Sequence, residues 1–138
     1  MLEQVLELVC NLDDMSAEAI AFAQQLLLDE GALDVYTASI GMKKGRIGTS
    51  LTCMCKAADR DKMMSLIFKH TTTLGLREYV SNRYSLKREF SKIQTKFGEL
   101  SLKTAYGFGV KKSKPEYEDV AQIAKKKGIS LKDVLDEV

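Results

Sequence analysis

The sequence predicts an α+β fold, a ferredoxin-like split βαβ sheet followed by an added β-hairpin and C-terminal helices. Apolar residues alternate with polar ones over residues 2–12, 34–42, 47–55 and 77–88, as is typical of strands. Helical spacing instead governs the segments between residues 16 and 31 and between 59 and 70. The resulting order, β-α-β-β-α-β, is that of two helices covering one face of a four-stranded antiparallel sheet.

Local signals set the ends of these elements. Ser16 is suited to cap the first helix, and Gly31 is expected to end it. A turn at residues 44–46 joins the second and third strands into a hairpin with a basic tip. Asp59 is suited to cap the second helix, and the segment 71–75 to end it.

A second hairpin is expected after residue 88, with its turn at residues 98 and 99. A basic linker over residues 111–114 then leads to a helix that begins at Pro115 and ends before Gly128. Residues 130–133 resemble a capping box and predict a short last helix.

The length and composition fit one domain. The 138 residues can bury one sizeable core, with a ferredoxin-like part over about 1–88 and the hairpin and helices over 89–138. Apolar residues at 45% and charged residues at 29% are typical of a globular chain and not of a disordered chain or a membrane protein. The net charge is only +2, but residues 1–40 hold eight of the 19 acids and none of the 21 bases. An acidic opening and a basic body suit a phosphate bound with a metal ion, and a solvated acidic face is the alternative that composition alone favours.

The three cysteines lack the C-x-x-C spacing of a zinc or redox motif, and no secretory leader is recognised, so we expect a cytoplasmic protein. Cys53 and Cys55 share one strand face, where they serve either the core or a soft metal. With a single histidine, a bound metal is expected to be held mainly by oxygen.

Two acidic residues, Asp13 and Asp14, follow the first predicted strand. Carboxylates at that position can hold Mg²⁺ or Mn²⁺ together with substrate phosphates and water. Ordinary capping of the next helix by Asp14 is the alternative.

Two further segments are suited to bind anions. The hairpin tip carries Lys43, Lys44 and Arg46, which can bind a polyphosphate or merely protect a sheet edge. In the segment 71–77, three threonine hydroxyls precede a glycine and an arginine, which forms a good anion-binding loop or a simple helix-to-strand connection.

The start of the third predicted helix mixes charges. Lys114 precedes three acids, Glu116, Glu118 and Asp119, which surround Tyr117. This mixture suits a metal–phosphate ligand, and dipole compensation of the helix explains the acids without a ligand.

Five short segments follow one another along the chain: 11–15 (NLDDM), 31–35 (GALDV), 42–46 (MKKGR), 71–77 (TTTLGLR) and 114–119 (KPEYED). Together they resemble the carboxy-terminal domain of the nickel insertion protein of nickel-pincer cofactor biosynthesis, the LarC family. The resemblance covers nearly the whole chain. It implies a lyase that inserts Ni²⁺ into pyridinium bisthiocarboxylic acid mononucleotide, the organic cofactor precursor, and cleaves CTP to CMP and pyrophosphate with Mn²⁺ or Mg²⁺. The product serves the maturation of lactate racemase.

The resemblance also implies site residues and partners. It places the triphosphate on Lys43, Lys44, Arg46, Thr71, Thr72, Thr73, Arg77 and Lys114, with Tyr117 against the base or ribose. It makes Asp13, Asp14, Glu116, Glu118 and Asp119 the candidate ligands of the divalent metal. The resemblance further implies a homo-oligomer, with a hexamer as the suggested size. It also implies a larger amino-terminal portion that is not in this sequence.

Two other functions fit the same residues. A basic ferredoxin-like module that binds nucleic acid would use the same cations. A structural oligomerisation domain would bind neither nucleotide nor nucleic acid.

Overall fold

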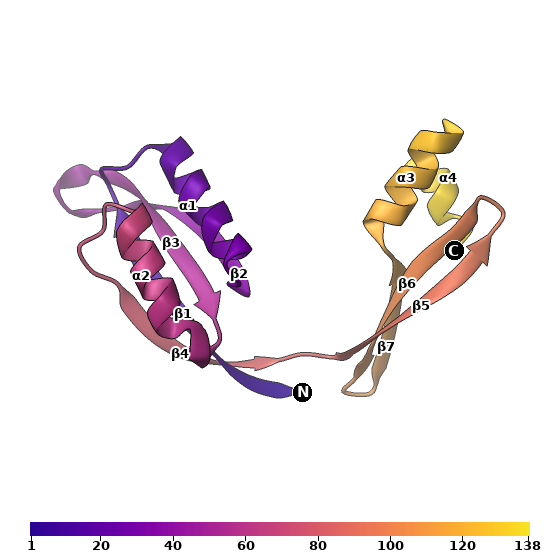
Figure 1. Cartoon of the computed structure of the whole chain (residues 1–138), viewed down its shortest axis with the longest axis horizontal. Coiled ribbons are helices and arrows are strands. Elements are labelled where there is room, and N and C mark those ends of the chain that lie inside the picture. Colours follow the sequence, from indigo (N-terminus) through magenta and orange to yellow (C-terminus); the bar gives the residue numbers. More distant parts are fainter. The chain divides into compact units, whose positions relative to one another are not determined.

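The computed structural model describes residues 1–138, which form two compact units (Figure 1). The first unit comprises residues 2–83, and the second comprises residues 84–138 together with Met1. Each unit has its own cluster of buried apolar side chains. The strand predicted over 77–88 is shorter than expected: it ends at Tyr84, and another strand begins at Lys87.

The first unit has the predicted ferredoxin-like order of elements. These are β1 (Leu2–Leu12), α1 (Ala17–Asp29), β2 (Asp34–Gly41), η1 (Lys43–Gly45), β3 (Ile47–Cys55), η2 (Ala57–Asp59), α2 (Arg60–His70) and β4 (Arg77–Tyr84). The strands lie in the order β2-β3-β1-β4, and β3 pairs antiparallel with both β1 and β2. This arrangement confirms the predicted fold class.

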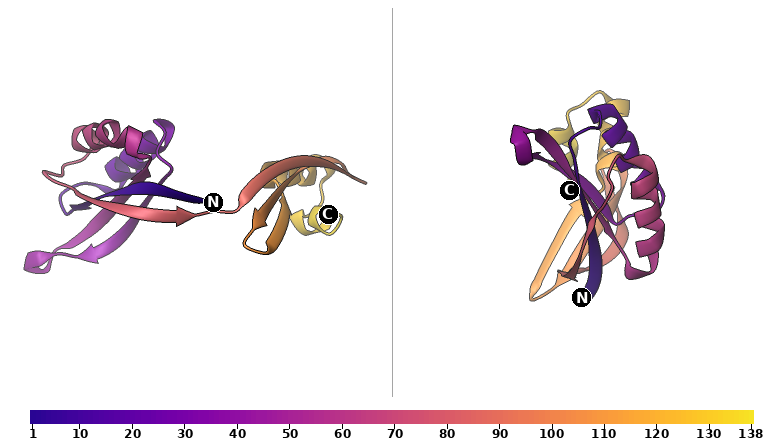
Figure 2. Two further views of the ribbon diagram at one scale, coloured as in Figure 1. Left: turned by 90° about the horizontal axis from the view of Figure 1, so that it is seen from below. Right: turned by 90° about the vertical axis from the view of Figure 1, so that its left-hand side faces the viewer.

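Both helices of the first unit lie on one face of its sheet (Figure 2). Beneath them, β1 buries Leu6, Leu8, Cys10 and Leu12, while α1 buries an apolar stripe of Ile20, Ala23 and Leu27. The predicted cap is confirmed as well, because the Ser16 hydroxyl accepts a hydrogen bond from the Ala19 amide.

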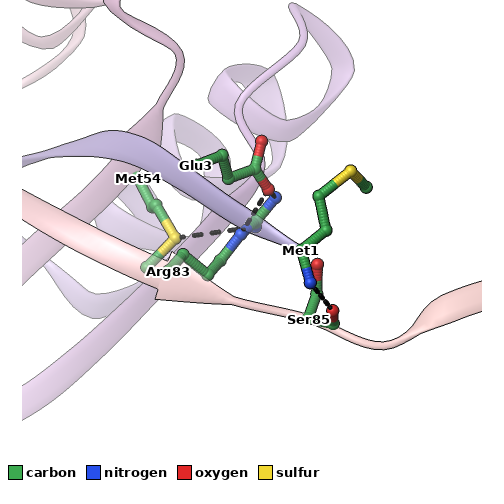
Figure 3. Close-up of polar contacts among 5 residues, drawn as sticks. All are labelled: Met1, Glu3, Met54, Arg83 and Ser85. Atoms are coloured by element: carbon green, nitrogen blue, oxygen red, sulfur yellow. Dashed lines mark hydrogen bonds and ion pairs between the residues drawn. The ribbon is translucent and has the colours of Figure 1, made fainter. Parts of the chain in front are cut away.

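Polar contacts cross the opposite face of this sheet. The Glu7 carboxylate accepts hydrogen bonds from the hydroxyls of Tyr36 (3.2 Å) and Ser81. Arg83 pairs with Glu3 and also lies against the Met54 sulfur (Figure 3). These contacts tie β1 to β2 and β4 on the face without helices.

The second unit is a three-stranded sheet with two helices. Its elements are β5 (Lys87–Thr95), β6 (Gly98–Gly107), β7 (Val110–Pro115), α3 (Tyr117–Lys127) and α4 (Leu131–Leu135), and the strands are antiparallel in the order β5-β6-β7. Its core consists of Leu100, Val120, Ala124 and Val134. Met1 joins this unit through two backbone hydrogen bonds with Ser85, 2.6 and 3.0 Å long (Figure 3).

The structure corrects three predictions in this unit. The turn of the hairpin lies at residues 96 and 97, because residues 98 and 99, where it was expected, already pair with β5 as the start of β6. The basic segment 111–114 is not a linker, because it pairs with β6 as part of β7. Pro115 is not the first helical residue; it ends β7, and α3 begins at Tyr117 after an N-cap at Glu116. Proline lacks an amide hydrogen, which a strand end tolerates as well as a helix start does. The end of α3 at Gly128, which has a φ of 68°, and the capping box of Ser130 and Asp133 are confirmed.

Candidate functional site

Three predicted segments of the first unit meet beyond the end of β1. Asp13 Oδ2 accepts a hydrogen bond of 3.0 Å from Arg46 Nη1 at the hairpin tip. Asp14 Oδ1 accepts one of 2.5 Å from the Thr72 hydroxyl, in the loop after α2. We call these four residues the β1-end cluster; its two hydrogen bonds join residues that are 33 and 58 positions apart in the sequence.

Close packing of the hairpin against β1 positions this cluster. Leu12, the last residue of β1, is aligned with Thr49 in β3. A Cβ atom added at Gly48 would lie 2.8 Å from the Leu12 carbonyl oxygen and 2.4 Å from the Met42 sulfur. The hairpin therefore needs glycine at this position to approach the end of β1. Its tip is closed by a 2.7 Å hydrogen bond from the Met42 amide to the Arg46 carbonyl.

The tip presents two more cations, Lys43 and Lys44, which are exposed and form no ion pair within the first unit. Lys44 adopts a left-handed conformation with a φ of 64°, which is uncommon for a residue with a side chain. The turn thus holds a strained lysine beside Arg46, and strain of this kind gathers at ligand-binding sites.

The threonine hydroxyls order the loop after α2. The Thr71 hydroxyl donates to the Ile67 carbonyl (2.7 Å), and the Thr73 hydroxyl donates to the Gly75 carbonyl (2.6 Å). Because each hydroxyl has one hydrogen to donate, a phosphate contact by these threonines would require an exchange of partners. The loop lies against the end of β1, since Thr73 and Arg77 both oppose the rise that burial causes in the pKa of the Cys10 thiol.

The carboxylates of the β1-end cluster suit a divalent ion that takes its remaining ligands from phosphates and water. No group of three or more His, Cys, Asp or Glu side chains is arranged to hold a metal ion. Asp13 and Asp14 offer two hard oxygen donors within one cluster. Mg²⁺ or Mn²⁺ commonly takes one or two carboxylates and completes its shell with phosphates and water.

The remaining predicted site residues lie in the second unit. Glu116 donates its amide to the Ser101 carbonyl (2.9 Å), and the Asp119 carboxylate accepts the Ser101 amide (2.7 Å). Asp119 therefore fixes α3 to β6. Tyr117 and Glu118 are exposed on α3, and Lys114 is exposed on β7 opposite Lys103.

The hydrogen bond from Ser101 lowers the pKa of Asp119 below its ordinary value of 3.8. A carboxyl with a lowered pKa in the folded state stabilises the fold above its unfolded pKa, and this contribution is lost as pH falls. We expect the second unit of the Asp119→Asn variant to lose less stability than the wild type between pH 6 and pH 3, as measured by denaturant unfolding. Parallel pH profiles for both proteins would contradict this role.

The cysteines serve the core of the first unit. All three are buried beneath the helices. Burial, with smaller effects from Cys55 and Cys10, raises the pKa of Cys53 to about 12. A thiol with so high a pKa stays protonated at neutral pH, whereas metals bind the thiolate. The structure therefore favours the core role over the soft-metal pair.

One group of functional interest was missed by the sequence analysis. Arg88, Lys103 and Lys112 lie with Lys114 around one hollow of the second sheet. The signal was the spacing of two between Lys112 and Lys114, which places both on one strand face. This spacing has a structural meaning only because the segment is a strand and not the expected linker.

These features define the class of the protein, an α+β domain with a ferredoxin-like unit whose first strand ends in paired carboxylates beside clustered cations. None of the helices combines the length and the apolar character that a membrane-spanning segment requires.

Comparison with known proteins identifies the family of the chain. Residues 1–135 match the family model of the nickel insertion protein, and the chain belongs to this family. It is 41% identical to the pyridinium-3,5-bisthiocarboxylic acid mononucleotide nickel insertion protein of Clostridium acetobutylicum over 88% of the chain, but it spans only 29% of that relative's length.

Solved structures show which part of the family the chain resembles. LarC2, the C-terminal domain of a cyclometallase involved in the synthesis of the NPN cofactor of lactate racemase, superposes with a TM-score of 0.93 at 34% identity, covering 99% of this chain and 95% of that one. The chain therefore corresponds to the carboxy-terminal domain of the family, as the resemblance predicted. A protein of Methanopyrus kandleri shares the fold, with a TM-score of 0.75 at 24% identity over 98% of this chain and 86% of that one.

Proposed function

We propose that this chain is the CTP-binding domain of a nickel insertase. The complete protein would insert Ni²⁺ into pyridinium-3,5-bisthiocarboxylic acid mononucleotide and cleave CTP to CMP and pyrophosphate. The substrate is the one in the name of the Clostridium relative, and the LarC2 structure belongs to a cyclometallase. The observation that carries the CTP assignment is the β1-end cluster, which joins two carboxylates to the basic hairpin tip and the threonine loop.

Cations from two segments would bind the triphosphate. Lys43, Lys44 and Arg46 come from the hairpin tip, and Arg77 follows the threonine loop. One guanidinium group can donate two hydrogen bonds to a phosphate, and lysines add mobile positive charge. Thr72 would act through Asp14, whose orientation it fixes. Thr71 and Thr73 would hold the loop in shape, and we retain Lys114 and Tyr117 only as contacts that the resemblance suggests.

We assign the divalent ion, Mn²⁺ or Mg²⁺, to Asp13 and Asp14. We favour these two carboxylates because they lie in one cluster with the hairpin tip and the threonine loop. Glu116, Glu118 and Asp119 lie in the second unit and stay as the candidates that the resemblance also suggests. When bound there, the divalent ion would neutralise negative charge on the pyrophosphate leaving group. The chain's own cations would share this task, and Ni²⁺ is the inserted substrate.

The family relationship extends the proposal to the protein's surroundings. We propose that the protein is a cytoplasmic homo-oligomer and that the oligomer is a hexamer. Because the chain spans about three tenths of its relative's length, we also propose that it works with a larger amino-terminal portion. The product would be the nickel-pincer cofactor that lactate racemase requires.

A calorimetric comparison distinguishes this function from its rivals. The chain is titrated with CTP, ATP and a short single-stranded RNA. The proposal predicts that CTP binds more tightly than ATP. A nucleic-acid-binding module would instead favour RNA, with an affinity that falls steeply as salt rises. Binding of none of the three would indicate a structural oligomerisation domain.

A further inference from the structure

We propose that the open face of the β5-β6-β7 sheet binds the pyridinium mononucleotide substrate, a planar cationic ring that carries acidic groups and a phosphomonoester. This inference rests on the proposed function, and it adds a second ligand site to the one at the β1-end cluster. The site consists of Arg88, Lys103, Lys112 and Lys114 around Ala105, with Phe90 beside them. We call these six residues the cationic face.

Strand register places the six residues in two neighbouring rows. Arg88, Ala105 and Lys112 are aligned across the three strands. Phe90, Lys103 and Lys114 form the next row on the same face, two residues along each strand. The small Ala105 side chain stands between two long cationic ones and leaves the sheet hollow at that point. This hollow has a volume of about 360 Å³ and is lined by all four cations.

The positive charges are not compensated within the second unit. None of the four cations forms an ion pair there, whereas nearby Lys92 pairs with Glu99 (3.1 Å). Lys103 and Lys114 are directly aligned on adjacent strands, and like charges in that relation destabilise a sheet. Side chains that oppose folding in this way indicate a ligand that neutralises them.

Phe90 adds a surface for a flat ring. Its side chain is 67% exposed, and the Lys103 ammonium lies 5.8 Å from its ring centre. An aromatic face attracts cations, and a pyridinium ring is both flat and cationic. The ring could replace the lysine over Phe90, while the lysine turns to an acidic group of the ligand.

The charge of the hollow distinguishes this ligand from a metal–triphosphate complex. No carboxylate lines the hollow. A CTP–metal complex needs a site that also holds the metal, as the β1-end cluster can. A phosphomonoester with ring acids needs only cations, and a mononucleotide suits a pocket of this size.

The test uses nicotinic acid mononucleotide as the probe, because it has a pyridinium ring, one ring carboxylate and a phosphomonoester. Isothermal titration is performed on the wild-type chain and on the Arg88→Ala, Lys103→Ala and Phe90→Ala variants. The matched control is Lys125→Ala, an exposed lysine on α3 without an ion pair in this unit. Lys114 is left unchanged because the resemblance also assigns it to CTP.

We expect the wild type to bind the probe and Arg88→Ala and Lys103→Ala each to weaken binding about tenfold or more. Phe90→Ala should weaken binding of the probe but not of inorganic phosphate, and Lys125→Ala should change neither. Melting temperatures of Lys103→Ala and Lys125→Ala should equal or exceed that of the wild type, which confirms that the variants fold.

Two outcomes would overturn the inference: a wild-type chain that does not bind the probe, whether or not it binds a short single-stranded RNA, or equal affinity of all variants for the probe. Titration of the same variants with CTP and Mn²⁺ separates this inference from the proposed function. If both are correct, Arg88→Ala keeps CTP affinity and loses probe affinity. If only the CTP assignment is wrong, the wild type binds the probe and not CTP.

Discussion

Replacing Leu8 with alanine is expected to destabilise the first unit by about 2–5 kcal/mol. The Leu8 side chain is fully buried in the middle of β1, among residues of the core cluster beneath α1 and α2. Truncation removes apolar contacts and leaves a cavity that the sheet cannot fill, because its strands are held in register by antiparallel pairing.

Denaturant unfolding followed by hydrogen exchange of the β1 and β3 amides measures this loss. The matched control is Leu2→Ala in the same strand, where the side chain is 57% exposed and the expected change is small. Equal, small losses for both variants would show that the core assignment is wrong.

Alanine at Lys44 or Arg77 is expected to weaken CTP binding about ten- to a hundredfold. A hydrogen bond to a charged group contributes about 1.5–3 kcal/mol, and these two cations reach the proposed triphosphate site from separate segments. Both side chains are exposed, so the fold should be unchanged.

Calorimetric titration with CTP and Mn²⁺ measures the effect, and Lys56→Ala is the control. Lys56 is an exposed lysine directly after β3, at the end of that strand away from the hairpin tip. If Lys44→Ala and Arg77→Ala both bind CTP as the wild type does, these residues do not contact the triphosphate.

The ferredoxin-like unit could be predicted because burial there follows sequence periodicity. In β1, alternate residues from Leu6 to Leu12 face the helices, and the α1 stripe recurs at helical spacing. One face of each element is apolar, so the period reveals the element and the side that it buries.

The second unit could not be predicted as fully. In β7, all residues from Val110 to Lys114 are exposed, so no apolar alternation marks the strand. Only backbone pairing with β6 identifies it. Pro115 then gave a false helix start, because its fixed φ fits both a helix start and a strand end.

The sequence indicates which residues are candidates for the site, but it does not reveal which side chains they contact. The sequence indicates Asp13, Asp14 and Arg46 as polar residues next to predicted strands, and the fold brings Arg46 into contact with Asp13. Partners of side chains depend on tertiary structure, so the sequence did not reveal that Thr72 orients Asp14 or that Asp119 is bound to Ser101.

The central claim is that a carboxylate pair at the end of β1 holds the divalent ion through which a nucleotide triphosphate binds. The direct measurement compares the affinity for CTP with and without Mn²⁺ in the wild type and in the Asp13→Asn/Asp14→Asn double variant, with Asp34→Asn as the control. Asparagine keeps the shape and a hydrogen-bond acceptor but loses the charge that hard ions require. We predict that Mn²⁺ strengthens CTP binding about tenfold or more in the wild type and in Asp34→Asn, and not in the double variant. The same Mn²⁺ enhancement in the double variant would contradict the account.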